Sequence, residues 1–529
     1  MHYLLPQLVD RSAEHRPDSA AIRCRGNEMS YAMLAEQSNR LAHMLADRGV
    51  ERGDRVGVLM NKCVECAVAI HGIMKAGAAY VPLDPAAPSG RHVFVARDCG
   101  IRHLVSEPRK QRAVAALSSE HELDSVIGCE VEDVFSSSFA ALESFEHRRP
   151  PDVQTMEQDL AYVLYTSGST GVPKGIMHTH RSGLAWAEVT VDVYGITHQD
   201  RISNYAPLHF DLSTLDYFGG ALAGATTVMV PEEVTKLPAS LAALVADERL
   251  TILYTVPLAL TQLARAGSIG QLDTGALRWI LFGGEQMPPK YLAELMRQLP
   301  HARFCNVYGP TETNGCTHFV IDPDYPHDRP VPIGAPYPNV EARVLDPNDR
   351  DVAVGEVGEL IIRAPTLMRG YWSRDDLNAR CSLYRDDLPG IPDRFHRTGD
   401  LVSETGEGTY RFIGRKDRQI KSRGCRVDLD EVEAILLGFE RVSEAAVFPV
   451  PDETGHLLIE SAVIAAGDGL SESDLRYTLK SRLPPYALPV RIDIVDELPR
   501  TSTGKVDRVT LAKSATERNE ATAAQAETS

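Results

Sequence analysis

A loop rich in hydroxyls and glycines follows the apolar run 160–165. It reads YTSGSTGVPKG over residues 165–175. Backbone N–H groups and hydroxyls on such a loop, directly after a strand-like segment, can donate to phosphate oxygens, and Lys174 adds a positive charge. The GxxxxGKS or GxxxxGKT spacing of the P-loop is absent. The loop therefore predicts a polyphosphate site of another kind, although its composition alone would also suit a solvated linker.

Four further polar motifs follow this loop along the chain. They are NVYGPTE at 306–312, HRTGD at 396–400, GRKDRQIK at 414–421 and RTSTGKVDR at 500–508. Together with the loop, and at this spacing, they resemble the signatures of the acyl- and aminoacyl-adenylating (AMP-binding) superfamily, with the stand-alone adenylation enzymes of nonribosomal peptide synthesis as the nearest type. The resemblance covers residues 1–512. It implies a ligase that joins an acid to AMP, releases pyrophosphate and then transfers the acyl group to a thiol.

The resemblance also implies ATP and Mg²⁺ as cofactors and places the groups that bind them. Glu312 corresponds to the Mg²⁺ ligand, while Lys174 and Lys505 are the catalytic lysines, Lys505 bridging the substrate carboxylate and the α-phosphate. Such cations are chemically necessary because the attack of a carboxylate on a phosphate brings two anions together. The positions assigned to ATP or AMP are Thr166, Ser167, Gly168, Ser169, Thr170, Gly171, Gly283, Gly284, Glu285, Asn306, Tyr308, Gly309, Thr311, Asp400 and Arg415.

The segment Phe210–Ser213 resembles the part of amino-acid-activating members that holds the substrate amine. Asp211 would be costly to bury without a cation, so a ligand ammonium is its natural complement. A helix cap for a helix starting at Ser213 is the alternative role. The spacing of the motifs assigns the pocket walls to Leu212, Leu215, Leu258, Leu281, Gly283, Val307, Gly315 and Cys316.

This lining is apolar and predicts that the substrate is a small apolar amino acid. The set resembles the pockets of stand-alone L-proline-activating enzymes, although Gly283 and Gly315 leave more room than that ring needs. The alternatives are an acyl-CoA or β-amino-acid ligase of the same superfamily and a catalytically silent nucleotide-binding homologue.

The resemblance places a domain hinge at Asp417, with Lys421 and Gly424 beside the tunnel for the thiol. A residue without a side chain suits a site where a pantetheine arm passes close to the backbone. Asp417 could instead be a turn carboxylate that pairs with Arg415 or Arg418. The expected acceptor is a discrete peptidyl carrier protein acting in trans, because no carrier segment follows residue 505; coenzyme A offers the same thiol.

The elements that must position these motifs can also be read from the sequence. A helix is expected over 30–49, capped by Ser30, and strands are expected from Arg55, Tyr80, Thr251, Trp279 and Arg303. This alternation predicts an α/β fold of doubly wound sheets in a large N-terminal domain, 1–416, with a β-rich subdomain at about 340–415. A small mobile α+β domain, 417–515, and a disordered tail, 516–529, complete the prediction.

The composition excludes several classes of partner. The 529 residues carry 55 Lys and Arg against 73 Asp and Glu, a net charge of -18, which argues against nucleic acid or an anionic membrane. No leader and no apolar stretch of ~20 residues is evident, so we expect a cytoplasmic protein. Cys63 and Cys66 have motif-like spacing but no second pair to complete a zinc site, and they are read as buried helix thiols.

Overall fold

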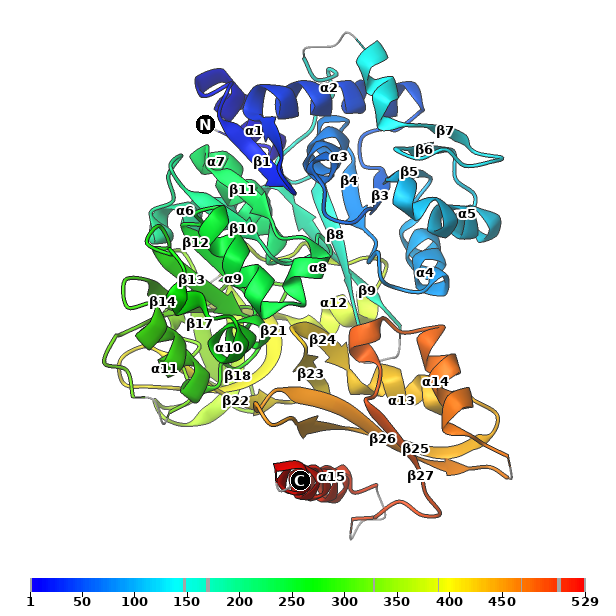
Figure 1. Ribbon diagram of the computed structural model, residues 1–529, viewed down its shortest axis with the longest axis vertical. Helices are drawn as coiled ribbons and strands as arrows, with labels where there is room; N and C mark the ends of the chain where they lie inside the picture. The colour runs from blue at the N-terminus through cyan, green and yellow to red at the C-terminus, as the bar shows by residue number, and fades with distance from the viewer. Residues whose placement is uncertain are drawn as a thin grey trace.

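A large N-terminal part built on three sheets stands above a smaller C-terminal part in Figure 1. The computed structural model describes residues 2–145, 149–167, 172–326, 329–388, 390–467, 469–501 and 506–527. Within these ranges, no helix is long and apolar enough to cross a membrane.

One sheet of the large domain is formed mainly by the first 180 residues. Its described strands have the order β19-β9-β8-β4-β3-β5-β6-β7. The central strand β3, Arg55–Leu59, pairs in parallel with β4, Ala79–Pro82, and with β5, His103–Ser106, and helix α3, Val64–Lys75, connects β3 to β4. The predicted strands from Arg55 and Tyr80 are therefore confirmed. The other strands are β6 Ser125–Ile127, β7 Phe135–Ser137, β8 Leu160–Thr166, β9 Lys174–Thr179 and β19 Gly370–Tyr371.

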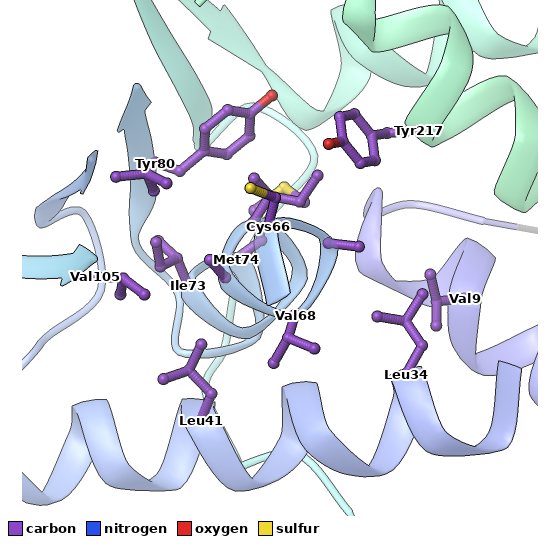
Figure 2. Packing of buried hydrophobic residues seen from close by; sticks show 14 of the residues in the cluster. Val9, Leu34, Leu41, Cys66, Val68, Ile73, Met74, Tyr80, Val105 and Tyr217 are labelled. Atoms are coloured by element: carbon purple, nitrogen blue, oxygen red, sulfur yellow. The ribbon is translucent and has the colours of Figure 1, made fainter. Parts of the chain in front are cut away.

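The predicted first helix is α2, Tyr31–Asp47, and its cap is the expected one. The Ser30 hydroxyl accepts a hydrogen bond from the backbone N–H of Met33 at 3.2 Å. Leu41 on the buried face of α2 packs against α3, as Figure 2 shows. The two helices approach closely because Gly72 of α3 has no side chain: a Cβ there would lie 2.7 Å from Leu41.

The second sheet carries the strands predicted from Thr251, Trp279 and Arg303. Strands β12, Ile252–Thr255, β13, Trp279–Gly283, and β14, Arg303–Tyr308, are parallel neighbours, so their carboxyl ends lie at one edge. Its described order is β16-β15-β14-β13-β12-β10-β11-β1-β2. The other strands are β1 Ala20–Cys24, β2 Asn27–Ser30, β10 Arg201–Asn204, β11 Thr226–Met229, β15 Thr317–Ile321 and β16 Ala335–Pro336.

Helices connect the strands of both parallel arrays, as a wound α/β fold requires. The described helices of the large domain, besides α2 and α3, are α1 Pro6–His15, α4 Ser89–Cys99, α5 Gln111–Glu120, α6 His180–Tyr194, α7 Gly220–Ala223, α8 Glu232–Thr235, α9 Pro238–Asp247, α10 Pro257–Ala266, α11 Pro289–Gln298 and α12 Asp375–Cys381.

The third sheet is antiparallel and corresponds to the predicted β-rich segment. Its strands are β17 Glu341–Leu345, β18 Val357–Arg363, β20 Ser382–Leu388, β21 Ile391–Glu404 and β22 Tyr410–Arg415.

The small domain begins with a β-hairpin that faces the large domain (Figure 1). The hairpin joins β23, Gln419–Ser422, to β24, Cys425–Asp428. Behind it lies a second sheet in the order β25-β26-β27, flanked by helices. These elements are α13 Leu429–Leu437, β25 Val442–Pro451, β26 Leu457–Ala465, α14 Glu472–Lys480 and β27 Arg491–Ile494.

The structure differs from the prediction at the C-terminus. Helix α15, Arg508–Glu527, runs through most of the segment that was expected to be a disordered tail. Ala515 is buried against Ala446 and Phe448 of β25, which anchors the helix. The alanine-rich sequence that follows has high helix propensity and continues it.

Candidate active site

The end of β8 and the start of β9 bring the first phosphate-binding candidates together. Thr166 lies directly opposite Lys174 in this antiparallel pair. Within the described part of the chain, the buried Thr166 Oγ1 has no hydrogen-bond partner. A buried hydroxyl without a partner next to a lysine fits a polyphosphate ligand. The predicted phosphate-loop residues Gly168, Ser169, Thr170 and Gly171 lie outside the described residues.

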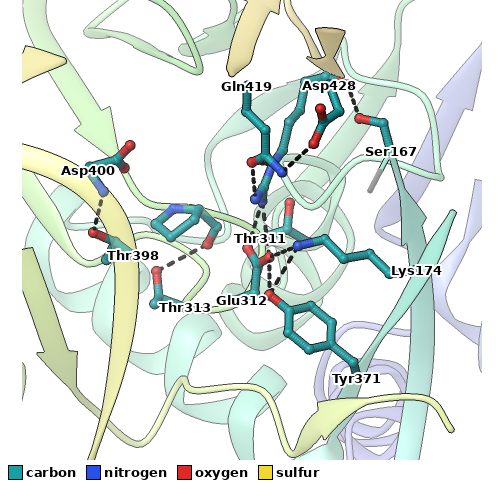
Figure 3. Close-up of polar contacts among 12 residues, drawn as sticks. Ser167, Lys174, Thr311, Glu312, Thr313, Tyr371, Thr398, Asp400, Gln419 and Asp428 are labelled. Atoms are coloured by element: carbon teal, nitrogen blue, oxygen red, sulfur yellow. Dashed lines mark hydrogen bonds and ion pairs between the residues drawn. The ribbon is translucent and has the colours of Figure 1, made fainter. Parts of the chain in front are cut away.

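Glu312 lies at the centre of a buried polar cluster shown in Figure 3. Its carboxylate is 1% exposed; Oε1 accepts hydrogen bonds from Lys174 Nζ at 3.1 Å and from the Tyr371 hydroxyl at 2.7 Å. Arg426 of the small domain donates to Oε2 at 2.8 Å. Burial by itself would raise the pKa of Glu312, but Arg426 and Lys174 hold it well below its usual range. Glu312 is therefore an ionised carboxylate that attracts cations.

The predicted nucleoside groups also converge. The Tyr308 hydroxyl donates to Asp400, and Arg415 forms an ion pair with the same carboxylate. Asp400 is buried, and burial raises its pKa while Arg415 opposes that shift. Arg415 also pairs with Asp417, Nε to Oδ1 at 2.6 Å and Nη2 to Oδ2 at 2.9 Å. Asp417 therefore pairs with Arg415 in this structure, which is the alternative to a hinge that the sequence offered.

A cavity next to these groups contains part of the predicted substrate pocket. Of the eight predicted walls, Leu212, Gly283, Val307 and Gly315 line it, together with Asp211. The other lining residues are Trp186, Tyr254, Gly284, Gly309, Asn314 and Lys421.

The other four predicted walls are not among the residues that line this cavity. Leu215 and Leu281 are fully buried in the core cluster that also contains Trp186 and Tyr254. Cys316 is buried in the core between the second and third sheets, and Leu258 lies on helix α10.

The space left by the glycines is filled by other parts of the chain. A Cβ at Gly315 would lie 2.1 Å from Cη2 of Trp186, and one at Gly283 would lie 2.3 Å from the carbonyl oxygen of Val307. The extra room expected from these two glycines is therefore absent. The Trp186 indole occupies the space beside Gly315 and thereby limits the size of the cavity.

Asp211 is the one carboxylate among the described residues that line the cavity. Burial raises its pKa, and the nearby Lys421 ammonium opposes that shift. The helical residues begin at Ser213, the start assumed for the alternative role of Asp211 as a helix cap. Asp211 therefore presents a carboxylate to a cavity that Lys421 also lines.

The β23–β24 hairpin docks the small domain onto this site. Gly424, with φ +79°, donates its N–H to Glu285, and a Cβ at this position would lie 3.1 Å from Val256. His456 Nδ1 also contacts Glu285, at 3.1 Å. Lys505 lies outside the described residues. The flanking residues Arg500 and Val506 pair with each other, and Val506 packs against the cluster that contains Ala446 and Ala515.

Comparison with known proteins decides the family. The family model described as "AMP-binding enzyme" matches residues 9–372, and the one described as "AMP-binding enzyme C-terminal domain" matches residues 431–505. The chain belongs to the AMP-binding enzyme family. It is a ligase of this family, as the order of its motifs predicted.

Relatives of this AMP-binding enzyme include single enzymes and parts of very long chains. It is 33% identical to an L-proline--[L-prolyl-carrier protein] ligase of Pseudomonas fluorescens, covering 96% of this chain and 99% of that one. It is also 32% identical to tyrocidine synthase 2 of Brevibacillus parabrevis, covering 96% of this chain but 14% of that one. The amide bond synthetase structure from Marinactinospora thermotolerans shares the fold, with a TM-score of 0.87 at 24% identity over 96% and 99% of the chains.

The sequence analysis missed several residues around the site, among them Trp186, Tyr371 and Arg426. Trp186 comes from helix α6 and Tyr371 from the short strand β19, and neither belongs to a recognisable motif. Arg426 ends the dense charged run GRKDRQIKSRGCR, which signalled a site without indicating which charge would reach it. Asn306, by contrast, was assigned to the nucleotide, and its side chain donates to the carbonyl of Pro332 at 2.8 Å.

Proposed function

We propose that this AMP-binding enzyme activates a small apolar L-amino acid, with L-proline as the best candidate, and transfers it to the phosphopantetheine thiol of a carrier protein. The observation that carries the proposal is Asp211. It is a carboxylate in a small cavity whose other large-domain walls are apolar or uncharged. A substrate ammonium would neutralise it, whereas a fatty or aryl acid would leave it with Lys421 of the small domain as its nearby cation.

In the first half-reaction, the substrate carboxylate attacks the α-phosphorus of ATP and pyrophosphate leaves. Lys174 and the Thr166 hydroxyl would hold phosphate oxygens, and Lys505 would neutralise the two reacting anions. Tyr308 would stack on adenine, with Asp400 holding the ribose hydroxyls. Glu312, an ionised carboxylate beside Lys174, suits a hard divalent ion, so Mg²⁺ would supply further charge neutralisation there.

In the second half-reaction, the thiol attacks the aminoacyl carbonyl and AMP leaves. The docked hairpin, with Gly424 against Val256, supports this arrangement as the one that forms the thioester. We propose a hinge at Asp417 between a large domain, 1–416, and a small domain, 417–515. Rotation there would exchange Lys505 for the hairpin between the two steps.

Three observations support the choice of L-proline. Trp186 fills the space beside Gly315, which limits the size of a side chain in the cavity. The relative with the matching full length is named for L-proline and its carrier protein. A pyrrolidine ring needs no polar group beyond one for its ammonium, in agreement with Leu212 and Val307 as walls.

An ATP–pyrophosphate exchange panel of amino acids, their des-amino analogues, fatty acids and aryl acids tests the proposal. The expected result is exchange with L-proline or a similarly small amino acid, and almost none with the des-amino acid. A preference for a fatty or aryl acid would replace the proposal by an acyl-CoA ligase. No exchange with any acid would indicate a silent homologue. Offering coenzyme A and holo-carrier protein separately then identifies the thiol acceptor.

A further inference from the structure

The loop that carries Asp211 is closed by a hydrogen bond between its two ends. Strand β10 ends at Asn204, and Asp216 lies in the π-helical turn that follows the loop. The Asn204 side chain donates from Nδ2 to Asp216 Oδ2 at 3.0 Å, and both residues are 1% exposed. Residues 205–215 therefore form a loop whose ends are tied inside the core, with Asp211 near its middle.

Lys62 binds the first end of this loop from the other sheet. It follows strand β3, and its buried Nζ donates to the carbonyl oxygens of Asn204 at 3.0 Å, of Val230 at 3.1 Å and of Tyr205. These carbonyls stand at the carboxyl ends of the neighbouring parallel strands β10 and β11 (Figure 1). Burial lowers the pKa of Lys62 to about 8, which leaves the side chain cationic at neutral pH. An ammonium has three N–H donors, so each donor has its own carbonyl.

The pairing of Asp216 with Asn204 suits a neutral acid. Burial raises the pKa of Asp216 well above its usual range, although Asn204 and Lys62 oppose that shift. In the described part of the chain, Oδ1 of Asn204 and Oδ1 of Asp216 are both buried without a hydrogen-bond partner. A protonated Asp216 supplies the O–H that the Asn204 oxygen lacks, so the acid and the amide can join through two hydrogen bonds.

Between its ends the loop is held by its own turns. The backbone N–H of Phe210 donates to the carbonyl of Pro207 at 3.0 Å, and that of Thr214 donates to the carbonyl of Asp211 at 2.9 Å. Such turns fix the shape of the loop but do not attach it to the rest of the domain. The position of Asp211 in the cavity therefore depends on how the two ends are attached.

We propose that Lys62, Asn204 and Asp216, here called the clasp, are positioning residues that hold Asp211 where the substrate ammonium binds. The inference rests on the proposed function, in which Asp211 receives that ammonium. None of the three clasp residues is among the described residues that line the cavity, so the clasp acts through the loop. A displaced Asp211 would meet the ammonium poorly, and a shift of about 1 Å in a binding group can cost about a hundredfold in rate.

The test separates the two substrates of adenylation. Lys62→Met removes the ammonium and keeps a side chain of similar length. We expect the KM for L-proline, or for the best amino acid of the panel, to rise at least about tenfold in pyrophosphate exchange, while the KM for ATP stays within about twofold. The preference for the amino acid over its des-amino analogue should fall by a similar factor, because the analogue has no ammonium for Asp211.

Lys75→Met is the matched control. Lys75 is another buried lysine, on helix α3, and its Nζ donates to Asp10 at 2.6 Å, to Asn39 at 2.7 Å and to the carbonyl of Ala35 at 3.3 Å. Its loss should also destabilise the core and reduce the amount of active enzyme, which lowers the apparent kcat but leaves the KM for the amino acid unchanged. A role of Lys62 in stability alone would give the same pattern.

A double-mutant cycle tests the other half of the clasp and does not depend on the folding of Lys62→Met. If Asn204 and Asp216 act as a pair, Asn204→Ala and Asp216→Ala should each raise the KM for the amino acid. The double variant should then have a KM no higher than that of the worse single variant. Independent roles would instead multiply the two effects.

Three results would overturn the proposal. The first is a KM for the amino acid that does not change in Lys62→Met, and the second is an equal rise in the KM values for the amino acid and for ATP. The third is a double variant in which the effects of Asn204→Ala and Asp216→Ala multiply. Failure of the amino-acid assignment is separate, since it would appear in the exchange panel with the wild type before any variant is measured.

Discussion

The indole of Trp186 stands where a side chain at position 315 would be: Cη2 lies 2.1 Å from the Cβ that Gly315 lacks. Trp186 is 2% exposed and its ring packs edge-on against Tyr337, with centroids 5.6 Å apart. The indole is therefore fixed in place by the core behind it. Trp186 and Gly315 thus limit the cavity that Asp211 also lines.

Replacing Trp186 with alanine should open the cavity and change substrate preference. We expect kcat/KM for leucine or phenylalanine relative to proline to rise at least about tenfold, since one size step in an apolar pocket is worth roughly 1–3 kcal/mol. Pyrophosphate exchange measures both substrates. Trp372→Ala, which removes an indole outside the cavity, is the control. An unchanged ratio in Trp186→Ala would show that Trp186 does not limit the substrate.

Asp211→Asn should weaken the distinction between amino acids and their des-amino analogues. Breaking a buried ion pair costs roughly 3–5 kcal/mol, and only the carboxylate supplies a full counter-charge. The ratio of the two exchange rates should fall at least about tenfold in the variant. If Asp211→Asn discriminates as well as the wild type does, the ammonium is recognised elsewhere.

Lys505→Ala should abolish formation of the aminoacyl-AMP but leave transfer of a preformed adenylate to the carrier. This prediction comes from the motif RTSTGKVDR, because Lys505 itself lies outside the described residues. The lysine is needed only where the substrate carboxylate and the α-phosphate meet. Single-turnover measurement of each half-reaction checks it, and an adenylation rate within about threefold of wild type would remove Lys505 from the mechanism.

Asp417→Pro should spare adenylation and impair thioester formation, since proline restricts φ to near -65° at the proposed hinge. The same change removes the ion pair between Asp417 and Arg415. Asp417→Asn removes the charge while the backbone stays free, and it should affect transfer much less. Equal loss of both half-reactions in the proline variant would point to misfolding; equal transfer defects in the two variants would point to the ion pair.

Stability should fall in acid partly because of His71. Burial lowers the pKa of this histidine to about 3, whereas an unfolded chain protonates it near 6.5. Between these values the unfolded state binds a proton that the native state does not, so stability is lost as pH falls below about 6.5, by up to ~1.4 kcal/mol per pH unit. In His71→Gln, unfolding should take up one proton fewer in this pH range, so the urea midpoint should depend less steeply on pH. The exposed His15→Gln should keep the wild-type dependence. Parallel slopes for wild type and His71→Gln would contradict this.

Much of the fold could be predicted because local signals and tertiary packing agree. Ser30 caps α2 as expected, and the run from Arg55 is β3, since capping and apolar periodicity are properties of neighbouring residues. The tail beyond 515 was expected to be disordered, and helix α15 runs into it. Its composition suits disorder, but Ala515 is buried against β25 and the helix continues from that contact.

The sequence by itself determined the family and predicted the residues of the nucleotide site. Thr166 and Lys174 stand at the facing ends of two paired strands, Glu312 follows β14, and Asp400 lies within β21 opposite Arg415. Each of these placements is set by one strand and its neighbour. The tertiary structure alone decided the size of the cavity and the partner of Glu312. Trp186 is 129 positions from Gly315, and Arg426 is 114 positions from Glu312. No local pattern encodes a distance across a sheet or between two domains, because it depends on how separately folded elements pack together.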